Sequence, residues 1–94
     1  MAANIEVSGD PLNNAIAAVL RMEQADQNLS DVFVYRKAGI ARATYERAIN
    51  DKRTMPMPVF ILICQALGVE ASDVAAKAFA RLEKADKAQA ESGR

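Results

Sequence analysis

The side chains with the clearest chemistry are basic, and they are concentrated in a short middle segment of the chain. Residues 36–53 contain six Lys or Arg and two acidic residues, a net charge of +4. Residues 1–35 contain one basic and five acidic residues, and the complete 94-residue chain has a net charge of zero. Such a local concentration of positive charge indicates an anionic partner, although a solvated helix face gives the same pattern.

This basic segment has the periodicity of a short amphipathic helix that begins at Ala41 and ends at Asn50 or Asp51. At about 100° per residue, one side of the helix is apolar, with Thr44 at its border. The apolar side consists of Tyr45, Ala48 and Ile49. The opposite side consists of Arg42, Ala43, Glu46, Arg47 and Asn50. The pattern predicts a helix that packs by its apolar side and presents its polar side to solvent.

Another short helix is predicted directly before it, over residues 31–38. Ser30 suits its N-cap and Gly39 its left-handed end, although Val32 and Val34 are also compatible with a strand. Two helices joined by a glycine-containing turn form a helix-turn-helix unit. Such a unit projects the outer side of its second helix, and an α-helix of this kind fits the major groove of DNA.

A helix that precedes this unit is predicted to begin at Asp10 and Pro11, which suit the N-cap and the first helical position. Its apolar residues recur at helical spacing, and the polar stretch 24–28 ends it. The apolar residues are Leu12, Ala15, Ile16, Val19 and Leu20.

Two helices are predicted after the basic segment. One begins at Met57 or Pro58 and is ended by Gly68, and it is apolar on nearly every side, so we expect it to be the buried central helix. It contains Cys64, which we expect to be a buried, packed residue. The last helix begins at Ser72 and frays after Ala85.

These elements predict an all-α protein with one compact five-helix domain. We expect this domain to occupy residues 11–88, between a flexible N-terminal arm (1–10) and a flexible tail (89–94). A chain of 94 residues buries enough surface for one modest core.

Residues 29–44 (LSDVFVYRKAGIARAT) resemble the helix-turn-helix of the lambda-repressor/Cro-type (Xre-like) regulators. That family has Leu-Ser/Thr at the start of helix two, Gly-Ile/Val in the turn, and Ser-Arg/Gln-Ser-Thr at the start of the recognition helix. The likeness continues through residues 47–53 (RAINDKR) and 63–69 (ICQALGV), and it covers about residues 12–82. It implies a lambda-repressor-like DNA-binding domain with the helix-turn-helix at helices two and three.

The predicted site is the outer side of the helix over 41–50, which the resemblance identifies as the recognition helix. Base-edge contacts are expected from Arg42, Ala43, Glu46 and Arg47. Phosphate contacts are expected from Thr44, Asn50, Lys52 and Arg53. Arginine bridges guanine O6 and N7, glutamate accepts from cytosine N4, and alanine contacts a thymine methyl group. Arg42 and Glu46 are also spaced for an ordinary i,i+4 ion pair, and Thr44 suits packing at the inner edge equally well.

Four residues depart from the family pattern. Asp31 replaces the usual Gln at the start of helix two, where its charge favours the helix dipole but repels phosphates. Ala41 replaces the usual Ser or Thr N-cap, a loss of about 1 kcal/mol. Tyr35 replaces a small Ala and needs room between helices two and three or at the surface, and Asp51 replaces a Gly. Together with Phe33, Tyr35 is expected to be packing material rather than a stacking platform for bases.

The resemblance implies a sequence-specific, double-stranded DNA-binding transcriptional regulator. The expected type is a small Cro-like phage or prophage repressor that acts as a homodimer on a palindromic operator. Phe79 and Leu82 form the expected dimer surface, although their stripe can instead close the core of the monomer. The alternatives are an antitoxin, a restriction controller, or a protein-interaction module that binds a toxin or a polymerase subunit.

Other classes of function are disfavoured by what the sequence lacks. It has no histidine, no paired carboxylates at a defined site and no glycine-rich phosphate loop, so we expect no catalytic activity. One cysteine without histidine supplies no usual zinc site, and we expect neither metal nor cofactor. The longest apolar run, residues 59–64, is too short to cross a membrane, and residues 1–6 do not begin a secretory signal. We expect a cytoplasmic protein.

Overall fold

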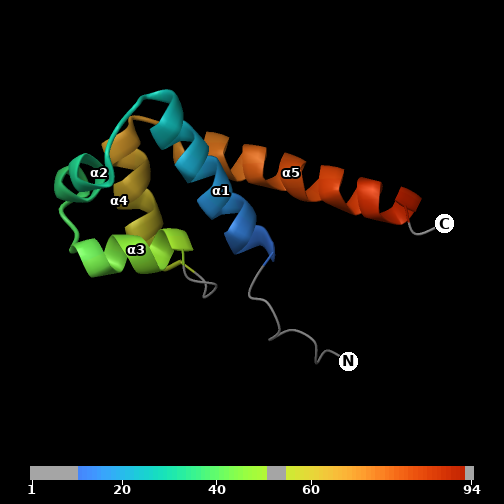
Figure 1. Cartoon of the computed structure of the whole chain (residues 1–94), viewed down its shortest axis with the longest axis horizontal. Helices are drawn as coiled ribbons and strands as arrows, with labels where there is room; N and C mark the ends of the chain where they lie inside the picture. Colours follow the sequence, from blue (N-terminus) through green and yellow to red (C-terminus); the bar gives the residue numbers. More distant parts are fainter. Residues whose placement is uncertain (1–10, 51–54, 93–94) are drawn as a thin grey trace.

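The described part of the chain folds into five helices around one core (Figure 1). The computed structural model describes residues 11–50 and 55–92, the last eight of these as helix backbone only. Within these ranges there is no strand. The helices are α1 (Pro11–Asp26), α2 (Asp31–Ala38), α3 (Arg42–Asn50), α4 (Met57–Leu67) and α5 (Ala71–Ser92). The predicted all-α fold, with a helix-turn-helix at α2 and α3, is confirmed.

The predicted helix ends of α2 and α4 are also confirmed. The Oγ atom of Ser30 accepts a hydrogen bond from the backbone N–H of Phe33 at 3.1 Å, so Ser30 is the N-cap of α2. Gly39 ends α2 with a φ of 74°, and Gly68 ends α4 with a φ of 71°. Both are left-handed conformations that glycine adopts without steric cost. The predicted N-cap Asp10 lies outside the described residues.

Helix α5 is longer than the sequence pattern predicts. It begins at Ala71, one residue before the expected start, and it continues to Ser92 instead of fraying after Ala85. Ala, Lys, Glu and Gln are strong helix formers, so helix propensity persists after the apolar stripe has ended. The second half of α5 extends beyond the other helices in Figure 1.

Helix packing surrounds α4 only in part. Helix α1 lies along α5, α2 packs against α4, and α3 contacts α1, α2 and α4. Each helix contributes a buried side chain to the core. These include Leu20, Val34, Ile49, Ile63 and Val74.

The expectation that α4 is buried on every side is wrong. Cys64 and its neighbour Ile63 are buried as expected, but Met57 and Ile61 are 65% and 36% exposed. They lie four residues apart and therefore on one side of the helix. A domain of this size has too few helices to cover the full circumference of α4.

Two side chains of α1 and its C-terminal turn hold both ends of α4. The backbone N–H of Met55, just before α4, donates to Oδ1 of the buried Asn13 at 2.7 Å. Nε2 of Gln27 donates to the carbonyl oxygen of Leu67, the last residue of α4, also at 2.7 Å. Both bonds satisfy backbone groups that lack a partner within α4. These bonds fix the position of α4, and α2 packs against α4.

No single helix within residues 11–50 and 55–92 is long and apolar enough to cross a membrane. Helices α4 and α5 pass that test only together, as a pair bent by 105°.

Candidate nucleic-acid interface

Helix α3 has one buried face and one exposed face, as the sequence predicts. Tyr45, Ala48 and Ile49 are buried, with Tyr45 only 2% exposed. The outer face is exposed throughout. It consists of Arg42, Ala43, Glu46, Arg47 and Asn50. The helix is therefore anchored from one side while its charged side chains are accessible to a partner.

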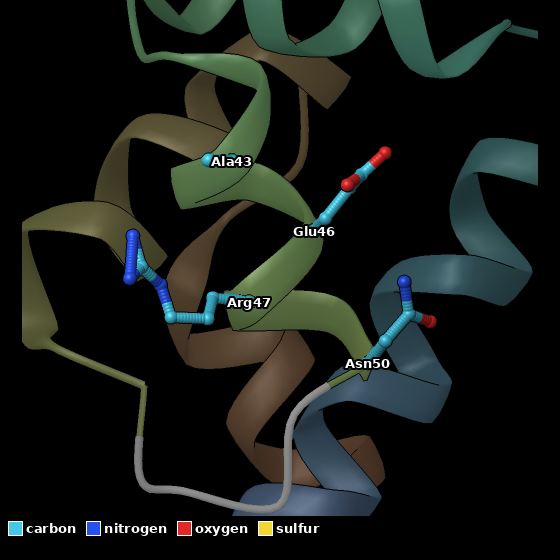
Figure 2. A pocket seen from close by; sticks show the side chains of 4 residues that line it. All are labelled: Ala43, Glu46, Arg47 and Asn50. Atoms are coloured by element: carbon cyan, nitrogen blue, oxygen red, sulfur yellow. The ribbon is translucent and has the colours of Figure 1, made fainter.

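Four of these outer side chains line a shallow, open hollow on the helix surface. They are Ala43, Glu46, Arg47 and Asn50. Figure 2 shows Arg47 extending to one side of α3, and Glu46 and Asn50 extending to the other. A cationic donor, a carboxylate acceptor and an amide thus extend from the same exposed face, and the small Ala43 lies one turn before Arg47. This set offers the donor, acceptor and methyl contacts that the edges of base pairs require.

Arg42 and Glu46 form the ion pair that their spacing allows. Nε of Arg42 donates to Oε2 of Glu46 at 2.9 Å, and their side chains are 72% and 48% exposed. The hydrogen bond to the Glu46 carboxylate raises the pKa of Arg42 above its ordinary value. An exposed pair of this kind contributes little to stability, so it opens at low cost when a stronger partner approaches.

The other predicted contact residues are placed differently. Arg47 is exposed, and within the described residues it makes no ion pair. Thr44 is half-buried at the border of the two faces, so its position fits both expected roles. Lys52 and Arg53, and the departure Asp51, lie outside the described residues.

A polar cluster behind α3 was not anticipated from the sequence. The hydroxyl of Tyr45 donates a short hydrogen bond to Oε1 of Gln24 in α1, and it lies 3.4 Å from Oδ1 of Asp31 in α2. Nε2 of Gln24 in turn donates to Oδ1 of Asp31 at 2.8 Å and to the carbonyl oxygen of Leu29 at 3.0 Å. Burial and the Asp31 carboxylate raise the pKa of Tyr45 to about 12.

A second polar contact holds the C-terminal end of α3. Nη1 of Arg21 in α1 donates to the carbonyl oxygen of Ile49 at 2.9 Å. This carbonyl is near the negative end of the helix dipole, where a cation is favourable. Arg21 was visible in the sequence as the only basic residue among residues 1–35. This isolated charge was the only indication in the sequence that Arg21 has a specific role. Its partner is a backbone carbonyl, which no sequence pattern identifies.

The two aromatic residues of α2 have different environments. Tyr35 is half-buried, and its ring centroid lies 6.1 Å from that of Tyr45 with the planes tilted by 47°. It therefore occupies the space between α2 and α3. Phe33 is 45% exposed, with the ammonium group of Lys37 5.6 Å from its ring centroid, so the expectation that it is packing material is wrong. Its position before Val34 in α2 turns it away from the core.

The predicted dimer surface on α5 is divided between two roles. Leu82 packs partly against the core, whereas Phe79 is 56% exposed. Ala75, one turn before Phe79, lines an apolar cavity of about 260 Å³. The other apolar lining residues include Leu12, Ile16, Met57 and Phe60. On another side of α5, Nζ of Lys77 pairs with Oε2 of Glu23 in α1 at 2.8 Å.

No group of three or more His, Cys, Asp or Glu able to hold a metal ion occurs among the described residues. Cys64 is buried, and burial raises the pKa of its thiol to about 11.

Helix α2, the left-handed Gly39 turn and the outward-facing α3 define a helix-turn-helix domain of the all-α class. The fold is similar to that in the crystal structure of the clp gene regulator ClgR from Corynebacterium glutamicum. The TM-score is 0.70 at 21% sequence identity, and the match covers 85% of this chain and 87% of that one. No protein-family model matches the sequence, and no curated protein matches it. The structural likeness therefore shows a shared fold.

Proposed function

We propose that this chain is a sequence-specific transcriptional regulator that inserts α3 into the major groove of double-stranded DNA. The observation that carries the proposal is the division of α3 into two faces. Its buried residues fix the helix, and its outer residues carry exposed charge within the segment of net charge +4. The likeness to a gene regulator supports the same function.

In this proposal four residues contact base edges: Arg42, Ala43, Glu46 and Arg47. Arg47 is the principal contact, because no intramolecular ion pair within the described residues must open before it bridges guanine O6 and N7. Arg42 and Glu46 first exchange their mutual pair for contacts to DNA. Ala43 approaches a thymine methyl group.

Phosphate contacts are assigned to Thr44, Asn50, Lys52 and Arg53. Such contacts require charge or a hydrogen-bond donor within reach, and they fix the register of the protein on the duplex. They carry no sequence information by themselves.

The specific form that we propose is a small Cro-like phage or prophage repressor, acting in the cytoplasm as a homodimer on a palindromic operator. Phe79 is the proposed centre of the dimer surface, with Leu82 at its edge. In a twofold dimer the same patch is used by both copies. Ala75, which lines the apolar cavity, precedes the exposed Phe79 by one helical turn, so each copy offers both a projecting ring and a nearby apolar recess. An antitoxin or a restriction controller would use the same two surfaces.

Selection from a random pool of DNA duplexes, followed by sequencing of the bound fraction, tests the proposal. We expect an enriched palindromic motif. Binding to that motif should depend on salt, with a log–log slope of about −4 for a dimer in which Lys52 and Arg53 of each subunit neutralise one phosphate apiece. A pool without enrichment, or a slope near zero, would contradict DNA recognition.

A second candidate function is a protein-interaction module that binds a toxin or a polymerase subunit. It is favoured by the zero net charge of the whole chain and by the exposed aromatic rings of Phe33 and Phe79. Co-purification with one protein partner, together with no enriched DNA motif, would support this candidate and overturn the first.

A further inference from the structure

Three polar side chains from three different helices meet behind α3. Tyr45 belongs to α3, Gln24 to α1 and Asp31 to the first turn of α2. Gln24 acts at the centre, because it accepts from the Tyr45 hydroxyl and donates to Asp31 at 2.8 Å. Helix α3 is thus joined by directional hydrogen bonds to α1 and, through Gln24, to α2.

This arrangement is more specific than core packing requires. An apolar side chain at position 45 would fill the same interior face without any hydrogen bond, as Ile49 does one turn later. A buried hydroxyl costs free energy unless it is paired, and pairing fixes the direction of the side chain. Tyr45 pairs with Gln24 while its ring contacts Tyr35, so its orientation is determined from two sides.

The orientation of Tyr45 determines where the outer residues of α3 point. Glu46 follows Tyr45 directly and Arg47 comes next, so a rotation of α3 about its own axis moves both side chains. Base-edge contacts depend on placement within about 0.5 Å and 10–20°, because both donors of a guanidinium must meet their acceptors together. Phosphate contacts tolerate more displacement, because they depend chiefly on charge and reach.

We infer that Tyr45, Gln24 and Asp31 are positioning residues that set the rotation of α3, and thereby the sequence specificity of the protein. They touch no base themselves. This inference rests on the proposed DNA-binding function, and it adds a cause of specificity that lies behind the recognition helix.

The test compares two substitutions that each remove one tyrosine hydroxyl. Tyr45→Phe removes the hydroxyl that bonds to Gln24, whereas Tyr35→Phe removes a neighbouring hydroxyl that makes no hydrogen bond within the described residues. Val74→Ala, in α5, serves as a control for loss of stability without a change behind α3.

Affinity is measured for the duplex that the wild-type protein selects and for a scrambled duplex of equal length. We expect Tyr45→Phe to lower the ratio of these two affinities about fivefold to tenfold, mainly by weakening the selected duplex. Gln24→Ala should lower the ratio by a similar factor, and the double variant should lower it no further. Tyr35→Phe and Val74→Ala should leave the ratio unchanged. An unchanged ratio in Tyr45→Phe overturns the inference, because a merely stabilising hydrogen bond lowers stability without altering specificity.

Hydrogen exchange tests the positioning role of the cluster separately from the proposed DNA-binding function. If the wild-type protein selects no DNA, that function is wrong, and the exchange of backbone amides alone decides whether the cluster positions α3. We expect Tyr45→Phe to speed exchange in α3 more than in α4 and α5. Uniformly faster exchange in all helices would show that the cluster contributes only global stability, and it would overturn the positioning role.

Discussion

Helices α3 and α5 are both amphipathic, but they expose different chemistry. Helix α3 buries its aromatic and aliphatic residues and exposes charged and polar groups with one alanine. Helix α5 buries Val74 and Ala78 but leaves Phe79 56% exposed. Charge attracts an anionic partner over several ångströms, whereas an exposed ring gains free energy only when another surface covers it. This difference is the reason that we assign DNA to α3 and a second copy of the chain to α5.

The largest expected effect concerns the buried side of α3. Ile49→Ala should lower the free energy of unfolding by about 2–5 kcal/mol, because it removes a core side chain and leaves a cavity. Urea unfolding measures this change. The matched substitution on α5, Phe79→Ala, should change the stability of the monomer by less than about 0.5 kcal/mol. Equal losses of unfolding free energy for Ile49→Ala and Phe79→Ala would contradict this comparison. They would show that the exposed side of α5 stabilises the monomer as much as the buried side of α3 does.

Alkaline pH should lower the free energy of unfolding, because it ionises Tyr45 on the buried side of α3. The pKa of buried Tyr45 is about 12 instead of 10, so the folded state favours the protonated hydroxyl. Its contribution is complete below pH 10 and is lost as the pH rises towards 12, a decrease of about 2–3 kcal/mol in the free energy of unfolding. The thiol of Cys64, with its pKa raised to about 11, acts in the same direction. The difference in pH dependence between wild type and Tyr45→Phe therefore isolates the tyrosine, and identical dependence would contradict its role.

The outer face of α3 should affect binding without affecting stability. Arg47→Ala is expected to cost about 1–3 kcal/mol in binding to the selected duplex and to relax the preference at one base position. Fluorescence anisotropy with single-base variants of the duplex measures both effects. Thermal unfolding of the variant should match that of wild type, because Arg47 is exposed. Wild-type affinity and selectivity in this variant would refute the assignment of Arg47.

The exposed ring on α5 should affect self-association. Phe79→Ala is expected to weaken the dimer by about 1–2 kcal/mol, roughly a tenfold change in its dissociation constant, as for a moderate interface residue. Analytical ultracentrifugation over a range of concentrations measures it. Ala80→Ser, at an exposed neighbouring position, is the control and should leave association unchanged. A wild-type protein that stays monomeric at all concentrations would contradict the dimer.

The fold was predictable from the sequence where local physics decides it. The cap of Ser30 and the left-handed glycines Gly39 and Gly68 depend on residues within a few positions, and each was identified from its neighbours. The inner face of α3 followed from the helical period alone. These features need no knowledge of how distant parts of the chain meet.

The features that were missed depend on distant contacts. Gln24 looked like part of a polar stretch that ends a helix, yet it bonds to Tyr45, 21 residues later. The exposure of Phe33, Met57 and Ile61 depends on how many helices cover each side, which periodicity cannot specify. The roles of the outer residues of α3 remain predictions, because exposure establishes access and not contact.

The separation of the two faces of α3 has a consequence for how such a protein changes over time. Arg42, Ala43, Glu46 and Arg47 contribute nothing to the core, so substitutions among them leave the fold intact. Under the proposed function, new target preferences can therefore arise by exchanging a few surface side chains on an unchanged scaffold. Substitutions at Tyr45 or Ile49 face a stricter constraint, since each alters the scaffold itself.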